Sequence, residues 1–158
     1  MPSVYTLNTG APGKETSRLD FQHGVFLKMT GTLLPPDISV SISSSSNIHV
    51  ADLACGTAIW LKSLTPQLPP TAQLHGFDMS THKFPAPSTL PANFHLHTHN
   101  VLDPFTEQYL GVFDVAHVRL LMYGLKKEEW ILAVKNVMTI LKPGGWLFWE
   151  ETGYQSCK

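Results

Sequence analysis

The feature that most constrains this fold is a series of short apolar segments that recur between residues 47 and 150. Their length and their β-branched and aromatic residues are typical of buried strands, which we expect at 47–53, 73–78, 93–98, 112–116 and 146–150. Helical or turn-rich stretches separate these segments. Because alternating strands and crossovers favour parallel pairing, the sequence predicts an α/β fold with a doubly wound, mostly parallel sheet of about five strands.

Two of the connecting stretches have a helical pattern. Residues 57–64 begin at Thr57, a residue type suited to an N-cap, and are followed closely by a proline. Residues 126–141 place Val134 and Val137 on one apolar face and run into the helix-stopping sequence P-G-G. In contrast, three prolines within 79–92 argue against a regular helix there.

The first 46 residues have a different pattern. Spaced apolar side chains predict a helix at 14–29, weakened by Gly24, whereas 35–46 combines two prolines with a run of serines and is expected to be flexible and turn-rich. We therefore divide the chain into an N-terminal helical or lid segment at 1–46 and a core at 47–158.

Composition excludes several partner classes. The 158-residue chain has 11 Lys and Arg against 12 Asp and Glu, so it lacks the basic excess that binds a nucleic-acid backbone. No apolar run approaches the roughly 20 residues of a membrane span, and the first residues do not have the pattern of a signal peptide. The two cysteines match no zinc spacing. These observations predict a cytoplasmic protein that binds neither nucleic acid nor membrane.

The turn after the first predicted strand, D-L-A-C-G-T-A at 52–58, has the context of a ligand-binding turn. Gly56 allows close approach of a ligand, and the helix that starts at Thr57 favours a carboxylate through its free N–H groups. Asp52 is placed to accept a hydrogen bond from an ammonium. The turn lacks the glycines of a dinucleotide fingerprint, since Ala54 and Ile59 occupy those positions. An ordinary strand-to-helix connection is the alternative interpretation.

The ends of the next strands carry further candidates. Asp78 ends the second strand, where a carboxylate commonly accepts hydrogen bonds from ribose hydroxyls, and Met79 beside it is suited to pack on an adenine. After the third strand, Asn100 and Val101 can supply a side-chain acceptor and a backbone N–H. His117 is expected at the carboxyl end of the fourth strand. A capping or solvated role for Asp78 is the alternative.

The histidines and Arg119 leave several roles open. His95, His97 and His99 alternate and would share one strand face, but without visible supporting acceptors we expect strand-end histidines and no metal. His23 and His117 titrate near neutrality, yet neither has a partner visible in the sequence, so no catalytic base is assigned. Arg119 either lines the site or has a structural role.

Five segments together resemble a known family in their order along the chain. They are D-L-A-C-G-T-A, F-D-M-S, H-N-V-L-D-P-F, F-D-V-A-H-V-R-L-L and L-K-P-G-G-W-L-F-W-E-E. This order resembles the class I S-adenosylmethionine (SAM) dependent methyltransferases, which have a Rossmann-like fold. The last three, with Y-T-L and R-L-D-F-Q-H near the start, look like the branch of fungal secondary metabolism that methylates small molecules.

The resemblance implies a cofactor site residue by residue. It assigns SAM binding to the candidates already singled out, namely Asp52, Ala54, Gly56, Thr57, Asp78, Met79, Asn100, Val101 and His117. Tyr5 and Gln22 match positions in the leading segment that close over the cofactor. The chain departs from the family at Ala54 and Ala58, where glycine is usual, and at Asn100, where an acid is commoner.

The family fold continues beyond a fifth strand, and the missing part normally supplies much of the substrate pocket. With the chain ending soon after residue 150, we expect the apolar strand at 146–150 to form an open edge that pairs with another chain or aggregates.

Four functions are compatible with these residues. The favoured one is SAM-dependent methyl transfer to a small-molecule acceptor. The second is a shortened, non-methylating protein that binds SAM or acts through a partner. A third uses the scaffold for a rearrangement or cyclisation, and an NAD-dependent oxidoreductase is disfavoured by the missing glycines.

Overall fold

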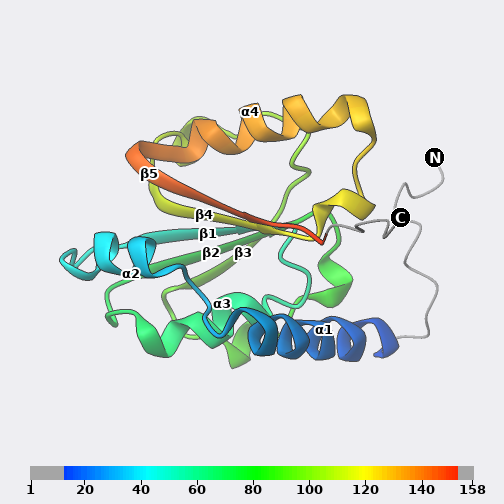
Figure 1. The fold of residues 1–158 in the computed structure, drawn as a ribbon, viewed down its shortest axis with the longest axis horizontal. Coiled ribbons are helices and arrows are strands. Elements are labelled where there is room, and N and C mark those ends of the chain that lie inside the picture. Colours follow the sequence, from blue (N-terminus) through cyan, green and yellow to red (C-terminus); the bar gives the residue numbers. More distant parts are fainter. Residues whose placement is uncertain (1–12, 153–158) are drawn as a thin grey trace, which may run out of the picture.

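A parallel sheet forms the centre of the computed structural model, which describes residues 13–152. The strand order is β3-β2-β1-β4-β5, and every neighbouring pair is parallel (Figure 1). The strands are β1 His49–Leu53, β2 Gln73–Asp78, β3 Phe94–Thr98, β4 Phe113–Arg119 and β5 Leu141–Glu150. The helices are α1 Lys14–Thr30, α2 Pro36–Ser43, α3 Ile59–Leu64 and α4 Trp130–Ile140. The predicted α/β fold with a leading helix is confirmed.

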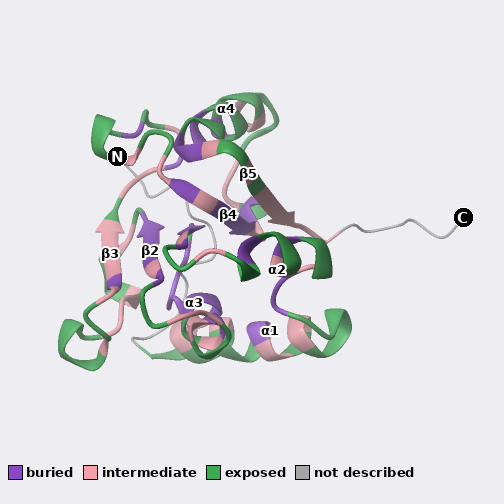
Figure 2. Cartoon of the chain, turned by 90° about the vertical axis from the view of Figure 1, so that its left-hand side faces the viewer, coloured by how far each residue is buried: buried purple, intermediate pink, exposed green. Residues whose placement is uncertain are grey.

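The two faces of the sheet have separate cores, because successive side chains of a strand point to opposite faces. On one face Val50, Leu74 and Val115 pack with α2 and α3, and on the other Ala51, Phe77 and Ala116 pack with α4. Figure 1 shows α4 on one side of the sheet and α1 and α3 on the other. Figure 2, an end-on view, shows the central strands largely buried and the outer turns of the helices exposed. Asp52, Asp78, His117 and Arg119 lie two or four residues from members of the first set on the same strands, so they belong to the face of α1 and α3.

The predicted strands are all present, with small changes at their ends. β2 has the predicted bounds, and β4 continues three residues further, to Arg119. β5 begins directly after α4: Leu141 pairs with Phe113, and a β-bulge precedes the pair of Val115 with Trp146. The proline-containing stretch 79–92 forms only short 3₁₀ turns, as predicted. No helix in residues 13–152 is long and apolar enough to cross a membrane.

Three local predictions are wrong. Part of the stretch 35–46, expected to be flexible, forms α2, because Pro36 occupies the first turn and Ile38 and Ile42, one turn apart, are buried in the core. α4 buries Val137 but leaves Val134 exposed, since its packed face is formed by Ala133, Asn136, Val137 and Ile140. α3 begins at Ile59 rather than at Thr57.

Candidate functional site

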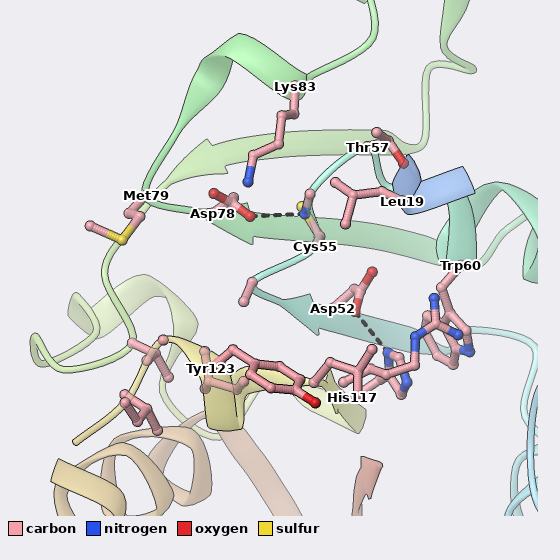
Figure 3. A pocket seen from close by; sticks show the side chains of 18 of the residues that line it. Leu19, Asp52, Cys55, Thr57, Trp60, Asp78, Met79, Lys83, His117 and Tyr123 are labelled. Atoms are coloured by element: carbon pink, nitrogen blue, oxygen red, sulfur yellow. Dashed lines mark hydrogen bonds and ion pairs between the residues drawn. The ribbon is translucent and has the colours of Figure 1, made fainter. Parts of the chain in front are cut away.

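The strand ends predicted to bind a ligand surround a single pocket of about 390 Å³. It lies at the carboxyl ends of the strands, where parallel α/β sheets bind their ligands, and α1 forms part of its wall. All nine predicted residues line it: Asp52, Ala54, Gly56, Thr57, Asp78, Met79, Asn100, Val101 and His117. Figure 3 shows Asp52, Asp78, His117 and Thr57 around this cavity, with Lys83 and Tyr123 as further wall residues. Gln22 also lines it, whereas Tyr5 lies outside the described residues.

The turn between β1 and α3 has an unusual backbone. Ala54, Gly56 and Ala58 all have a left-handed conformation, with φ of 54°, 56° and 56°. This conformation explains why glycine is usual at 54 and 58, because a Cβ there is strained. Gly56 is further restricted by α1, since an added Cβ would lie 3.1 Å from Leu19 Cδ1. The turn therefore keeps the shape of a glycine-rich loop with alanine at two positions.

Thr57 does not act as the predicted N-cap. The N-cap of α3 is Ala58, which has no side-chain cap, and the Thr57 hydroxyl donates instead to Asp20 Oδ1 at 2.7 Å. Because Asp20 belongs to α1, this hydrogen bond ties the leading helix to the turn. Thr57 is buried and Asp20 is exposed, so the bond joins the interior of the turn to the surface of α1.

Asp78 is a buried acid of the pocket that is held by the backbone. The residue is 5% exposed, and its carboxylate accepts two backbone hydrogen bonds, from Gly56 N–H at 2.8 Å and from Ser80 N–H at 2.9 Å. The two bonds go to different oxygens, so each oxygen retains a lone pair for a further donor. This burial does not match the alternative of a solvated side chain.

The loop after β3 places Asn100 and Val101 on the pocket wall. Asn100 Oδ1 accepts a hydrogen bond from Leu102 N–H at 3.1 Å, which fixes the side chain within its own turn. The Val101 carbonyl accepts from Asn136 Nδ2 of α4 at 2.9 Å. Met79, the residue after Asp78, is 55% exposed and lines the pocket.

Three ionisable residues are hydrogen-bonded in a row beside the pocket, and two of them, Asp52 and His117, line it. His117 lies between Asp52 Oδ1, 2.8 Å from Nδ1, and Glu150 Oε2, 2.8 Å from Nε2. Its ring stacks on Trp60 with centroids 3.8 Å apart, and the side chain is 1% exposed. His117 thus has a carboxylate oxygen within hydrogen-bond distance of each ring nitrogen.

This arrangement corrects the expectation that His117 lacks a partner. Asp52 is its register neighbour on β1, a relation that the order of strands creates. Glu150 was not singled out in the sequence, because its place beside His117 depends on the bulge between β4 and β5. The acid at the end of the segment W-L-F-W-E was the sequence signal that could have identified Glu150.

The leading helix is joined to the same region through His23. The ring of this 5% exposed residue contacts Ser63 Oγ at 3.0 Å through Nε2 and the Arg119 guanidinium at 3.1 Å through Nδ1. Burial, followed by the nearby Arg119 charge, lowers the pKa of His23. The guanidinium also lies 5.3 Å from the ring centroid of Phe26. α1 thus packs on the pocket through specific polar contacts.

Comparison with known protein families agrees with this geometry. Residues 50–145, more than half of the chain, match the family described as a methyltransferase domain. The chain belongs to this methyltransferase family. The match covers every predicted site residue from Asp52 to His117.

Two curated relatives are similar to this chain over most of its length. The chain is 38% identical over 161 residues to methyltransferase grgD of Penicillium sp, covering 98% of this chain and 54% of that protein. It is 34% identical over 135 residues to N-methyltransferase tcpN of Claviceps purpurea, covering 84% and 47%. The chain thus spans about half the length of these relatives. The predicted resemblance to methyltransferases of fungal secondary metabolism is confirmed.

Solved structures share the fold of this methyltransferase domain. The plantazolicin methyltransferase BpumL, in complex with a desmethylPZN analogue and SAH, aligns with a TM-score of 0.69 and 16% identity. The alignment covers 89% of this chain and 52% of that one.

A second group of histidines lies on the opposite face of the methyltransferase sheet. His75 Nδ1 and His97 Nε2 are 3.0 Å apart, and His97 Nδ1 lies 3.2 Å from the Tyr109 hydroxyl. His95 Nε2 contacts Gln73 Oε1 at 3.3 Å, whereas His99 packs on the ring of Phe105 instead of joining the group. Burial, with the neighbouring histidines, lowers the pKa of His75 to about 3. Within residues 13–152 no set of three or more His, Cys, Asp or Glu is arranged to hold a metal ion.

Proposed function

We propose that this chain binds SAM in the 390 Å³ pocket and supports methyl transfer to a small-molecule acceptor of secondary-metabolite type. The observation that carries the proposal is the convergence of all nine predicted residues, from four strand ends, on that pocket. Chance placement of strand-end residues would not gather them around one cavity.

The residues present fit the parts of SAM. Asp78, fixed by two backbone N–H groups and retaining free lone pairs, suits the ribose hydroxyls. Asp52 suits the ammonium, and Gly56, which has no Cβ, allows the amino-acid end to approach the turn closely. Asn100 and Val101 suit the adenine. Bound SAM supplies an electrophilic methyl group.

The contribution of the protein is binding and orientation. Holding donor and acceptor in line lowers the barrier by several kcal/mol, up to about 7–11 kcal/mol in intramolecular reactions. Asp52 and His117 line the same pocket, and the His117 ring joins Asp52 to Glu150 through its two nitrogens. A nitrogen acceptor is supported by the names of three relatives, the N-methyltransferases tcpN, verN and sirN, which are 34%, 29% and 30% identical.

Calorimetric titration with SAM and with S-adenosylhomocysteine (SAH) tests the cofactor site. We expect micromolar binding by the wild-type chain, weakened about 10- to 100-fold in Asp78→Ala by the loss of charge-assisted hydrogen bonds to the ribose. Asp103→Ala is the matched control, because this exposed acid follows the next strand but does not line the pocket. A folded wild-type chain that binds neither compound would refute the proposal.

A non-methylating role is the second candidate. One relative, 30% identical over 137 residues, is the secondary metabolism regulator laeA of Coprinopsis cinerea. Incubation of the chain with SAM and a panel of amines and phenols separates the two. Methylated product supports the enzyme, and SAM binding with no product from any acceptor supports the regulator-like role.

We also propose self-association through β5. This strand is the last in the sheet, and its Trp146 is 38% exposed beside Val40 of α2, which is 72% exposed. Trp146 is joined to α2 by a hydrogen bond from Nε1 to Ser41 Oγ. An apolar edge of this kind pairs readily with another strand. Sedimentation should show dimers or larger species that Trp146→Lys reduces, and a wild-type monomer at moderate concentration would contradict the proposal.

A further inference from the structure

We propose that Arg119 is the carboxylate-binding residue of the pocket and that His23 holds its guanidinium in position. The inference deepens the proposed function and depends on it. Arg119 ends β4 and lines the pocket two residues after His117. The predicted adenine, ribose and amino-acid contacts lie on the ends of β3, β2 and β1. Arg119, on the next strand, therefore lies toward the amino-acid end of the cofactor or beyond it.

Three side chains from two helices orient the guanidinium. Arginine only donates hydrogen bonds, so Nδ1 of His23 must accept the 3.1 Å bond from Arg119. The proton of the neutral His23 ring is then on Nε2, from which it is donated to Ser63 Oγ of α3 at 3.0 Å. The Phe26 ring of α1 packs against the guanidinium. Contacts from α1 and α3 thus fix a side chain of β4.

The guanidinium lacks an acidic partner. No carboxylate among residues 13–152 lies within ion-pair distance of Arg119, and its bond to His23 uses one of five N–H groups. The nearest acids that influence it are Asp52 and Glu150, and both direct an oxygen to His117. A partly buried cation with unused donors, on the wall of a pocket, is suited to bind an anion.

A carboxylate is the anion that fits this geometry, because two parallel N–H groups of arginine match its two oxygens. It can come from two sources. One is the amino-acid end of SAM or SAH, and the other is an acidic group on the methyl acceptor. Both require the same contact, so one set of variants tests them together.

Calorimetry with SAH and with S-adenosyl-3-thiopropylamine, which is SAH without its carboxylate, distinguishes the sources. The variant is Arg119→Met, which removes the charge and keeps an unbranched stem beside Phe26. Lys62→Met, an exposed change of equal charge outside the pocket, is the control. If the carboxylate belongs to the cofactor, Arg119→Met weakens SAH binding about 10- to 100-fold and leaves the amine analogue unchanged.

If the carboxylate belongs to the acceptor, SAH affinity is unchanged in Arg119→Met. The SAH-loaded wild type then binds 4-hydroxybenzoate more tightly than its methyl ester, and the variant loses this preference. The proposal is wrong if SAH affinity is unchanged and no such preference exists or is lost. That result differs from failure of the proposed function, in which the folded wild type does not bind SAH at all.

Three further variants protect the test against misfolding and separate positioning from packing. Arg119→Lys keeps the charge and loses the two-pronged geometry, so it should give a smaller change than Arg119→Met. His23→Phe removes the acceptor that holds Arg119 and should weaken the same carboxylate-dependent binding. His23→Asn returns an oxygen near Nδ1 and should restore it, whereas a purely structural His23 would give no such rescue.

Discussion

Two groups of histidines lie on opposite faces of one sheet, and they differ in the side chains that contact their rings. On the α1 and α3 face, His117 has a carboxylate at each ring nitrogen and a tryptophan stacked on its ring. On the α4 face, His75 and His97 contact each other and Tyr109, with no acid bonded to either ring. His117 has a carboxylate oxygen at both ring nitrogens, whereas burial lowers the pKa of His75 and of His97 in the second group. Neighbours, not the imidazole itself, decide which histidine belongs to a reactive site.

The two regions also differ in backbone strain. Within residues 13–152, the three non-glycine residues with positive φ are Ala54, Ala58 and Leu120, all following the carboxyl ends of β1 and β4. The His75 group lies on regular strands. Unfavourable local arrangements that persist in a fold tend to cluster at functional sites. The strained residues and the carboxylates bonded to His117 therefore lie in the same region as the pocket.

The largest expected difference between the two regions is in stability. His117→Leu removes the group between Asp52 and Glu150 and leaves one buried and one partly buried acid without their shared partner. We expect a loss of about 3–5 kcal/mol in the free energy of unfolding. His75→Phe on the other face removes one neutral hydrogen bond and should cost only about 1 kcal/mol. Urea denaturation at pH 7.5 measures both, and equal losses would remove the distinction.

The second difference is in acid sensitivity. Folding lowers the pKa of His75 from 6.5 to about 3, so its neutral form is favoured in the folded chain. Its contribution to stability is complete above pH 6.5. As pH falls from 6.5 toward 3, the unfolded chain binds a proton that the folded chain does not, and stability declines. The slope is at most about 1.4 kcal/mol per pH unit, reduced because the ring is partly exposed.

Urea titrations between pH 7 and pH 4.5 test this expectation. His75→Phe should flatten the decline, although a slope remains because His23, His49, His97 and His99 also have lowered pKa values. An unchanged slope in His75→Phe would show that the far-face group does not contribute to acid sensitivity.

The sequence predicted most of the fold and nine of the residues that line the pocket, because both depend on local patterns. Strands alternate with crossovers, and acids and small residues follow directly after the strands, so topology alone brings Asp52, Asp78 and Asn100 together. The contacts between these residues and others were not predictable in the same way. Glu150 reaches His117 only through a bulge, and Thr57 bonds Asp20 of α1 because of how a helix docks. Both depend on tertiary packing that no local pattern records.

The smallest expected effect concerns the strained turn of the pocket region. Ala54 is exposed and has a φ of 54°, so Ala54→Gly removes a steric cost of about 1–2 kcal/mol and adds about 0.5–1 kcal/mol of chain entropy. The net result should be a gain of about 0.5–1 kcal/mol in unfolding free energy. Ala86→Gly is the matched control, because Ala86 is equally exposed with a φ of −60° and should only lose stability. Thermal unfolding of the two variants compares them directly. If Ala54→Gly were no more stable than Ala86→Gly, the left-handed turn would carry no measurable strain, and the contrast between the two regions would rest on the carboxylates of His117 alone.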